Sequence, residues 1–451
     1  MRKLFVLVFL CSLLLVQFYG LTTSNVTAES NTDDWPMFRH DPAHTGYSTG
    51  TASQSPARTW NYTTTNQIFY SPAIAEGYVY IKDTSSVISL NASTGSIVWK
   101  STYSSSESIS SPAIVDGYVY AGGYFYTGPG SESGDIYALN ASTGDKIWSY
   151  LTEDFVLSSP AVVGGVVYVG SSDHNVYALN AYTGTKMWNF TTKGSVTSSP
   201  TVVDGCVYVG SGDSQEDMGA SGEISDSNVY CLNASSGIKL WNYTTGSFVY
   251  SSPAVAKGYV YFGSDDGNVY ALNASTGDKI WSYPTGPNYA IVRSSPAVVG
   301  GIVYVGSYDG NVYALNASMG IKIWSFKTGG SVHSSPAVAD GVVYVGSYDR
   351  NVYALNASTG VKIGNFTTED SVRSSPAVVD DVVYVGSGHT FFALGTSSFK
   401  LAPPPASNLF PDYLLTIIVI VVVLVVVLLV VLLVYLKRRK VANQPRTNNK
   451  S

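Results

Sequence analysis

The stretch Ser334–Phe366, SSPAVADGVVYVGSYDRNVYALNASTGVKIGNF, is one copy of a unit that recurs through most of the chain. Its anchor is Ser-Pro-Ala or a close variant. A repeat of about 40 residues is typical of propellers and solenoids. The eight anchor prolines are Pro72, Pro112, Pro160, Pro200, Pro253, Pro296, Pro336 and Pro376.

Each unit predicts four short strands. In the opening copy the first three are the apolar run that begins at Ala337, then Val342–Gly346 and Asn351–Leu355. The fourth is seen in the preceding copy as Lys322–Phe326. β-Branched and aromatic residues favour strands, and the Gly, Asn, Asp and Ser residues between them favour hairpin turns. Four strands in a unit of this length are typical of a β-propeller blade.

The strand count predicts a closed ring. Most units carry a tryptophan in the fourth strand, but the seventh has Gly364 there. The eighth unit ends at 391–394 without a fourth strand, and 59–62, which contains Trp60, precedes the first anchor. We therefore predict an all-β, eight-bladed propeller closed by an N-terminal strand, with Trp60 beside Phe391. Such closure removes a free sheet edge.

These motifs resemble the pyrroloquinoline quinone (PQQ) repeat family. Its signature is Ala-Leu-(Asp/Asn)-Ala-x-Thr-Gly followed by Trp, as in Ala138–Gly144 with Trp148 and Ala271–Gly277 with Trp281. Asp34–Pro42 is similar to the family's lead-in. The resemblance covers Asp34 to Ser398 and implies the propeller fold. It implies no single function, because the family includes quinone-dependent dehydrogenases and cofactor-free scaffolds of bacterial outer-membrane assembly.

The N-terminus predicts export. Residues 1–28 have the charged start and apolar stretch of a signal peptide, although an uncleaved membrane anchor would share both features. A lead-in segment, 29–56, precedes the propeller, which we place at 57–398.

The C-terminus predicts a membrane anchor. A proline-containing stalk (399–412) leads to an apolar segment (413–436) long enough to cross a bilayer. The tail 437–451 starts with four basic residues, so we expect it to be cytoplasmic and the propeller to be extracellular. A buried core helix is the alternative for 413–436.

Asn-x-Ser/Thr sequons agree with an extracellular location, although asparagine also suits turns. The sequons that we expect to carry glycans start at Asn61, Asn91, Asn140, Asn189, Asn233, Asn242, Asn273, Asn316, Asn356 and Asn365. Cys206 and Cys231 fall on neighbouring predicted strands of one unit, where they fit either a disulfide or two independent buried thiols.

Catalytic chemistry is not evident. The resemblance implies that the family's dehydrogenases hold PQQ in the central channel with calcium, carboxylate and amide ligands and an Asp base. In this chain the acidic residues, such as Asp265 and Asp349, lie mostly in turns. We assemble neither a catalytic set nor a metal site, and expect no cofactor. His40 and His44, with Asp41, fit a metal site or a lead-in that packs on the propeller, and we favour packing.

Departures from the repeat are candidate functional positions. Two units carry insertions, 122–134 and 211–227, which are binding loops or tolerated surface insertions. The residue three before each anchor proline also varies: it is apolar in the first three units, and it becomes Tyr250, Arg293, His333 and Arg373 in the last four. We interpret these four as a rim near the channel mouth for an anionic or peptide ligand; variation at a solvated position is the alternative.

The sequence thus supports a membrane-anchored extracellular propeller that binds cell-surface proteins or glycans. A PQQ-dependent dehydrogenase with calcium and a purely structural envelope component are the alternatives. Nucleic acid is not an expected partner, because the net charge is −6 and no basic patch is evident in the propeller units.

Overall fold

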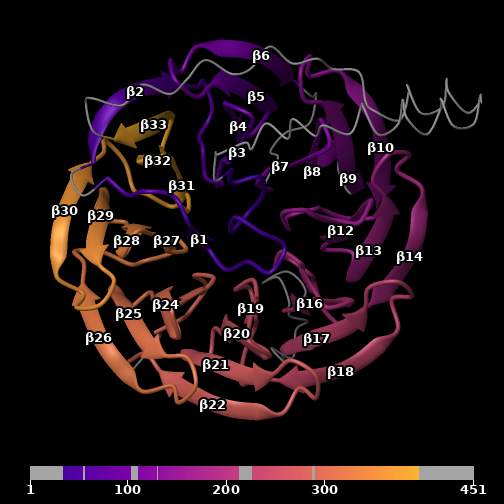
Figure 1. Cartoon of the computed structure of the whole chain (residues 1–451). Helices are drawn as coiled ribbons and strands as arrows, with labels where there is room; N and C mark the ends of the chain where they lie inside the picture. Colours follow the sequence, from indigo (N-terminus) through magenta and orange to yellow (C-terminus); the bar gives the residue numbers. More distant parts are fainter. Residues whose placement is uncertain are drawn as a thin grey trace, which may run out of the picture. The chain divides into compact units, whose positions relative to one another are not determined.

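The computed structural model describes residues 34–53, 56–102, 110–128, 131–212, 226–286 and 290–395, and every regular element in these ranges is a strand. The strands form eight antiparallel sheets arranged around a central axis (Figure 1). The eight-bladed, all-β propeller predicted from the repeat is therefore confirmed.

The four strands of a blade have fixed positions from the axis to the perimeter. The first, innermost strands are β3 (Ala73–Ala75), β7 (Ala113–Val115), β11 (Ala161–Val163), β15 (Thr201–Val203), β19 (Ala254–Ala256), β23 (Ala297–Val299), β27 (Ala337–Ala339) and β31 (Ala377–Val379). The second strands are β4 (Tyr78–Lys82), β8 (Tyr118–Gly128), β12 (Val166–Gly170), β16 (Cys206–Gly210), β20 (Tyr259–Gly263), β24 (Ile302–Gly306), β28 (Val342–Gly346) and β32 (Val382–Ser387).

The outer half of each blade follows the same order. The third strands are β5 (Ser86–Asn91), β9 (Ser131–Asn140), β13 (Asn175–Asn180), β17 (Asn228–Asn233), β21 (Asn268–Asn273), β25 (Asn311–Asn316), β29 (Asn351–Asn356) and β33 (Thr390–Gly395). The fourth, perimeter strands are β6 (Ile97–Thr102), β10 (Lys146–Thr152), β14 (Lys186–Thr191), β18 (Lys239–Thr244), β22 (Lys279–Pro284), β26 (Lys322–Lys327), β30 (Lys362–Thr367) and β2 (Ala57–Thr63).

The N-terminal strand β2 completes the eighth blade. It pairs antiparallel with β33, with Trp60 opposite Ala393 and Tyr62 opposite Phe391. The Trp60 and Phe391 rings lie 6.1 Å apart. The predicted closure of the ring by the N-terminal strand is therefore confirmed.

The Ser-Ser-Pro-Ala anchor connects strands within a blade and between blades. The first serine accepts a hydrogen bond from the glycine that ends the second strand, as in Gly346 N–H to Ser334 Oγ at 3.1 Å. The second serine Oγ accepts from the equivalent N–H of the preceding blade, as in Ser335 N–H to Ser375 Oγ at 3.0 Å. These bonds satisfy buried backbone donors around the axis.

The Thr-Gly turn and the tryptophan form the contact between blades. Trp188 donates its Nε1–H to Ala234 O of the next blade at 2.9 Å, and its ring lies against Gly237, which has a φ of 72°. A Cβ at Gly237 would come within 2.6 Å of that ring. Blade 8 ends at β33 and has no such turn, which explains why blade 7 carries Gly364 instead of tryptophan.

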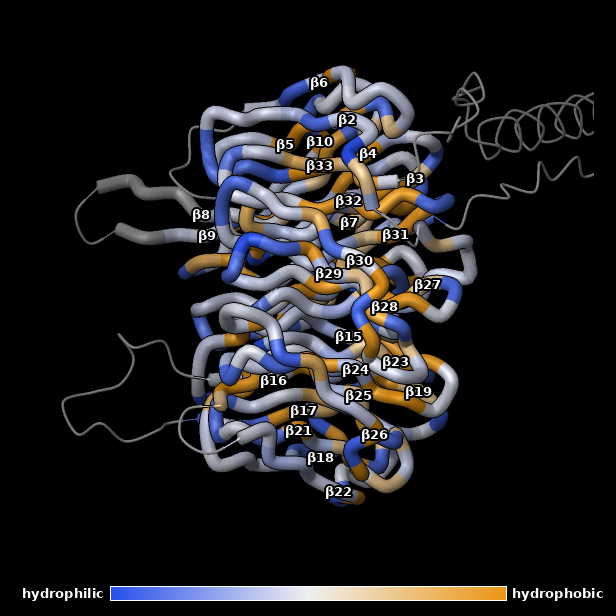
Figure 2. The backbone as a smooth tube through the Cα atoms, turned by 90° about the vertical axis from the view of Figure 1, so that its left-hand side faces the viewer, coloured by the Kyte–Doolittle hydropathy of each residue, from blue (hydrophilic) through white to orange (hydrophobic). Residues whose placement is uncertain are grey.

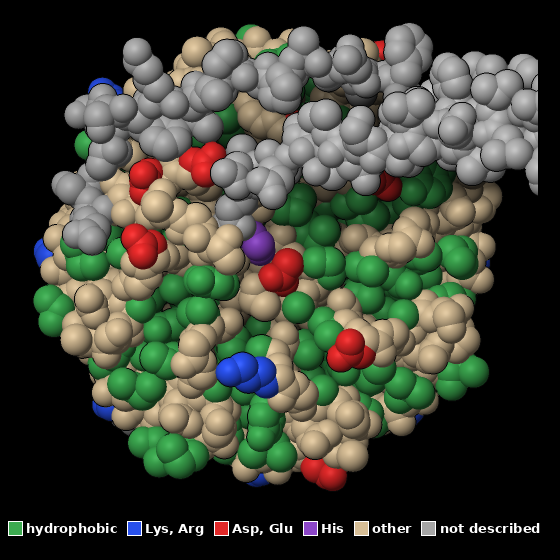
Figure 3. All heavy atoms as spheres, viewed as in Figure 1, with side chains coloured by type: hydrophobic (Ala, Val, Ile, Leu, Met, Phe, Trp, Pro, Cys, Tyr) green, Lys and Arg blue, Asp and Glu red, His purple; other side chains and the backbone are tan. Residues whose placement is uncertain are grey.

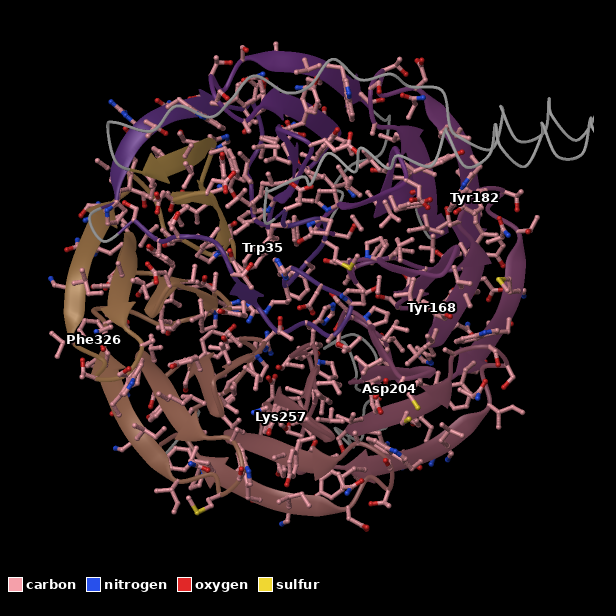
Figure 4. All side chains as sticks on the ribbon, in the orientation of Figure 1. Trp35, Tyr168, Tyr182, Asp204, Lys257 and Phe326 are labelled. Atoms are coloured by element: carbon pink, nitrogen blue, oxygen red, sulfur yellow. The ribbon has the colours of Figure 1, made fainter. Side chains whose placement is uncertain are left out.

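The lead-in segment closes one end of the central channel. It circles the axis, and its carbonyl oxygens accept hydrogen bonds from the second residue of most innermost strands, as Thr45 O does from Val298 N–H at 2.9 Å. Its short strand β1 (Tyr47–Ser48) pairs parallel with β27. Ser53 O then accepts from the Tyr344 hydroxyl at 2.6 Å, in place of the turn that blade 8 lacks. Trp35 lies near the axis on this side (Figure 4).

Two buried cations fix the lead-in. Arg39 is 1% exposed and donates to Pro296 O at 2.9 Å and to Pro336 O. Burial lowers its pKa to about 9. His44 Nδ1 lies 2.8 Å from Thr201 Oγ1 and 3.2 Å from Pro253 O. The predicted packing of the lead-in histidines on the propeller therefore holds for His44.

The two faces and the perimeter differ in composition. Seen from the side, hydrophobic segments run through the strands and hydrophilic ones mark the turns (Figure 2). The face with the lead-in carries few, scattered charges (Figure 3). Large exposed apolar side chains of the described residues lie only on the perimeter: Ile97, Val98, Ile147, Leu151, Tyr182, Met187, Ile238, Leu240, Ile280, Met319, Ile321, Ile323, Val361 and Ile363.

Several predicted segments lie outside the described residues. They are the signal peptide (1–28), the stalk (399–412), the apolar segment (413–436) and the basic tail (437–451). Within the ranges that are described, no helix has the length and hydropathy needed to cross a bilayer.

Candidate functional site

The end of the channel opposite the lead-in carries the residues that precede the innermost strands. The lead-in bonds to the second residue after each anchor proline, whereas these residues lie three before it, so they occupy the other end of each innermost strand. They meet the turns between second and third strands, as in Tyr348 N–H to Ser331 O at 3.0 Å. We call this end the mouth.

Arg293 forms the centre of one contact group at the mouth. Its Nη2 lies 2.7 Å from Asp265 Oδ2, and its Nε lies 3.1 Å from both oxygens of that carboxylate. The guanidinium also lies over the rings of Tyr250, at 4.5 Å, and Tyr308, at 5.7 Å. Its charge is thus neutralised by a carboxylate and braced by two aromatic rings.

His333 lies between two tyrosines. Its ring is 4.5 Å from that of Tyr308, edge to face, and 5.5 Å from that of Tyr348, stacked. Burial, followed by the positive charges of Arg293 and Arg373, lowers the pKa of His333 to about 4. The imidazole is therefore neutral near pH 7, with one nitrogen that donates and one that accepts hydrogen bonds.

Arg373 differs from Arg293 in its partners. Its guanidinium lies over the Phe69 ring at 5.3 Å and the Tyr348 ring at 5.1 Å. In the preceding blade Tyr348 occupies the turn position that Asp265 has beside Arg293. Arg373 is exposed, and in the described part of the chain it forms no ion pair. Its positive charge is therefore uncompensated within that part of the structure.

The structure joins these residues into one continuous row on part of the mouth. Rings and nitrogen-containing side chains alternate along the row, so each cation is held between aromatic faces. We name it the aromatic–cation crescent: Tyr250, Arg293, Tyr308, His333, Tyr348, Arg373 and Phe69.

Sequence reasoning found four members of the crescent and missed part of it. Tyr250, Arg293, His333 and Arg373 were singled out by their position before the prolines, and all four lie in the row. Tyr308, Tyr348 and the paired Asp265 were missed because they come from the turns of neighbouring units. The available signal was the residue after the turn serine, which is aromatic only in units six and seven.

Other acidic turn residues have structural partners. Asp349 accepts from Asn351 N–H at 3.0 Å and from the Tyr353 hydroxyl at 2.7 Å, and it also accepts from Gly329 N–H of the preceding blade. The hydrogen bonds lower the pKa of Asp349 against the opposing effect of burial. These contacts fix hairpins and blade seams.

A buried charged pair between blades 1 and 2 escaped sequence reasoning. Lys82 stands where the other second strands have glycine, and it donates to Gly122 O beside Asp135. Burial lowers the pKa of Lys82 to about 7 and raises that of Asp135 to about 6. Both side chains are at most 3% exposed, so they stabilise the seam rather than form an accessible site.

The remaining candidates lie away from the mouth. Cys206 in β16 and Cys231 in β17 are unbonded thiols in this structure and are diagonal neighbours across the strand pair. The disulfide stays a prediction. The insertion at 122–134 continues the β8–β9 strand pair, and residues 213–225 of the other insertion lie outside the described ranges.

Comparisons with known proteins agree with the fold. The PQQ_2 family model, described as outer membrane protein assembly factor BamB, matches residues 83–225, 132–284, 224–307 and 290–398. The chain belongs to this family. BamB of Salmonella typhimurium is 33% identical over 120 residues, which span 25% of this chain and 30% of that protein. The match thus covers less than a third of the relative.

Solved structures share the architecture with low sequence identity. BamB from Moraxella catarrhalis is 18% identical with a TM-score of 0.62, and the match covers 77% of this chain and 99% of that one. Quinohemoprotein alcohol dehydrogenase ADHIIG from Pseudomonas putida is 15% identical with a TM-score of 0.69, over 83% and 82%. A scaffold-type protein and an enzyme both match, so this likeness establishes the fold alone.

Proposed function

We propose that the chain is a membrane-anchored extracellular scaffold that binds a cell-surface protein partner at the aromatic–cation crescent. The observation that carries the proposal is the contrast between the channel ends: the lead-in fills one end, and the other presents a row of rings and cations with one uncompensated guanidinium. Aromatic and arginine side chains dominate the binding energy of protein interfaces.

Family membership supports a protein partner over a glycan. The relatives named for outer-membrane assembly act, by that name, among proteins. In this chain, residues 1–28 and 413–436 would export and anchor the propeller, and the basic tail would remain in the cytoplasm. A surface glycan that stacks on the same rings is the second ligand class, and it predicts retention by polysaccharide instead of protein.

The described residues do not fit a quinone dehydrogenase. Calcium would need converging carboxylate and amide ligands, and catalysis would need a free Asp base. In the described ranges no three His, Cys, Asp or Glu side chains converge on a metal position. Asp265, the carboxylate in contact with the crescent, is paired with Arg293. We derive no catalytic step through PQQ.

Site-specific crosslinking in intact cells tests the proposal. A photo-crosslinking amino acid at Tyr348 should trap a discrete protein partner. The same group at Lys257, which lies on the lead-in face (Figure 4), should not. Equal products from both positions, or polysaccharide alone at Tyr348, would contradict a protein site at the crescent.

A matched charge change sharpens the test. Arg293→Thr with Asp265→Ser reproduces the uncharged pair Thr197 and Ser172 of blades 3 and 4, and Arg373→Thr removes the free charge. Together they should abolish crosslinking at Tyr348. Arg350→Gly removes an exposed arginine from the same turn, where blades 5 and 6 have glycine, and should leave the crosslink intact.

A further inference from the structure

The perimeter of the propeller combines two features found together nowhere else in the described residues. Its fourth strands and the turns before them hold every large apolar side chain that is exposed there. Blades 6 and 7 are the densest: Met319, Ile321 and Val361 are 60%, 60% and 64% exposed, and Ile323 and Ile363 lie beside them. Contiguous exposed apolar surface of this kind is normally covered by something.

All ten sequons within the described ranges lie on the same perimeter. Six lie at the turn between third and fourth strands, such as Asn316 and Asn356. Four lie on the fourth strand itself, such as Asn365, two residues after Ile363. The modifiable asparagines and the exposed apolar side chains therefore share one surface.

The geometry of the turn asparagines leaves the modified atom available. Asn356 Oδ1 accepts from the N–H groups of Ser358, at 3.0 Å, and Thr359, at 2.9 Å, and so caps the turn. Its Nδ2, to which an N-linked sugar is attached, has no hydrogen bond in the described structure. A glycan there would leave the cap in place, because Oδ1 remains an acceptor.

The third blade provides a contrast within the chain. Its turn reads Asn180-Ala181-Tyr182, so it has no sequon. Tyr182 instead packs its ring on that of Tyr118, at 5.8 Å, and donates its hydroxyl to Asp116 Oδ2 at 3.0 Å. Where the sugar site is missing, a protein ring therefore covers the neighbouring surface.

We propose that N-linked glycans at the perimeter sequons cover the apolar belt of the fourth strands, in addition to marking the chain as exported. Sugars attached to asparagine are bulky and solubilising, and their C–H faces pack on apolar side chains. The inference rests on the extracellular placement proposed above, but it is independent of the partner at the crescent.

Glycopeptide mass spectrometry of the full chain from its native host tests the modification. Each perimeter peptide should carry a glycan mass. A perimeter without glycan overturns the inference. Protease accessibility of the propeller in intact cells then separates the causes: an accessible propeller without glycan contradicts this inference alone, and an inaccessible one contradicts the extracellular placement as well.

Carbene footprinting tests the covering. Ser318→Ala with Ser358→Ala removes two sequons and keeps both turn caps, because only the backbone N–H of each serine bonds to the asparagine. Labelling of Met319 and Val361 should rise about threefold, with buried Val338 unchanged. Ser318→Thr with Ser358→Thr keeps the sequons and should label as the wild type. Glycan loss without a change in labelling would overturn the covering role.

Discussion

Arginine and histidine stand at both ends of the channel, in opposite settings. At the closed end Arg39 and His44 are 1% and 2% exposed, and backbone carbonyls of Pro253, Pro296 and Pro336 hold them. At the mouth Arg293, His333 and Arg373 are held by aromatic rings, and only Arg293 has a carboxylate. The same side-chain types therefore face protein backbone at one end and solvent at the other.

The difference teaches which cations are available to a ligand. A buried guanidinium whose donors are used by carbonyls fixes the chain and leaves little capacity for another partner. A guanidinium that lies against aromatic faces keeps its edge N–H groups in the plane of the fork and thus free to bind. Four changes would break or sharpen this comparison.

The largest effect is expected for Arg39→Ala. The substitution leaves the carbonyls of Pro296 and Pro336 unpaired and opens a cavity, while it relieves the desolvation of a buried charge, so we expect a net loss of about 3 kcal/mol in the free energy of unfolding. Chemical denaturation measures it. Arg373→Ala should lie within about 0.5 kcal/mol of wild type; equal losses at the two arginines would remove the distinction between the ends.

Acid should destabilise the fold mainly through His44. Burial lowers its pKa from 6.5 to about 4, so below pH 6.5 the unfolded chain binds the proton first and stability falls until about pH 4. The shift corresponds to at most about 3 kcal/mol.

Unfolding midpoints measured from pH 7 to pH 4 test this expectation. His44→Gln should flatten the pH dependence most, and His333→Leu, which copies Leu157 of blade 3, should flatten it less because that imidazole is only partly buried. A steeper change on losing His333 would contradict the ranking.

Arg373→Ala should weaken partner binding about tenfold, or about 1.4 kcal/mol, because the uncompensated charge is lost. The measured quantity is the crosslink yield at Tyr348 across a dilution series of the partner fraction. Arg39→Lys serves as the control for a cation change at the closed end, and its yield should equal that of wild type.

The smallest effect is expected for Phe69→Leu. This change keeps an apolar side chain but removes one of the two rings over Arg373, so both stability and binding should fall by about 0.5 to 1 kcal/mol. Denaturation and the same crosslink titration measure the two. An effect as large as that of Arg373→Ala would mean that the ring itself contacts the partner.

The sequence predicted the blades well because their signals are local. The Ser-Pro-Ala anchors, the Tyr-Val strands and the Thr-Gly turns each specify conformation over a few residues, and the missing eighth fourth strand pointed to Trp60. The residue at 364 could be noted but not explained from sequence, because its reason lies in the next blade: no Thr-Gly turn exists there to receive a tryptophan.

By itself the sequence determined the number of blades, the ring closure and four residues of the mouth, since a periodic chain fixes which strand each residue occupies. Only the tertiary structure decided that the lead-in fills one end of the channel and that Tyr308 and Tyr348 join the cations at the other. Those contacts run between different blades and between segments hundreds of residues apart, such as Arg39 and Pro336, where no local pattern records the partner.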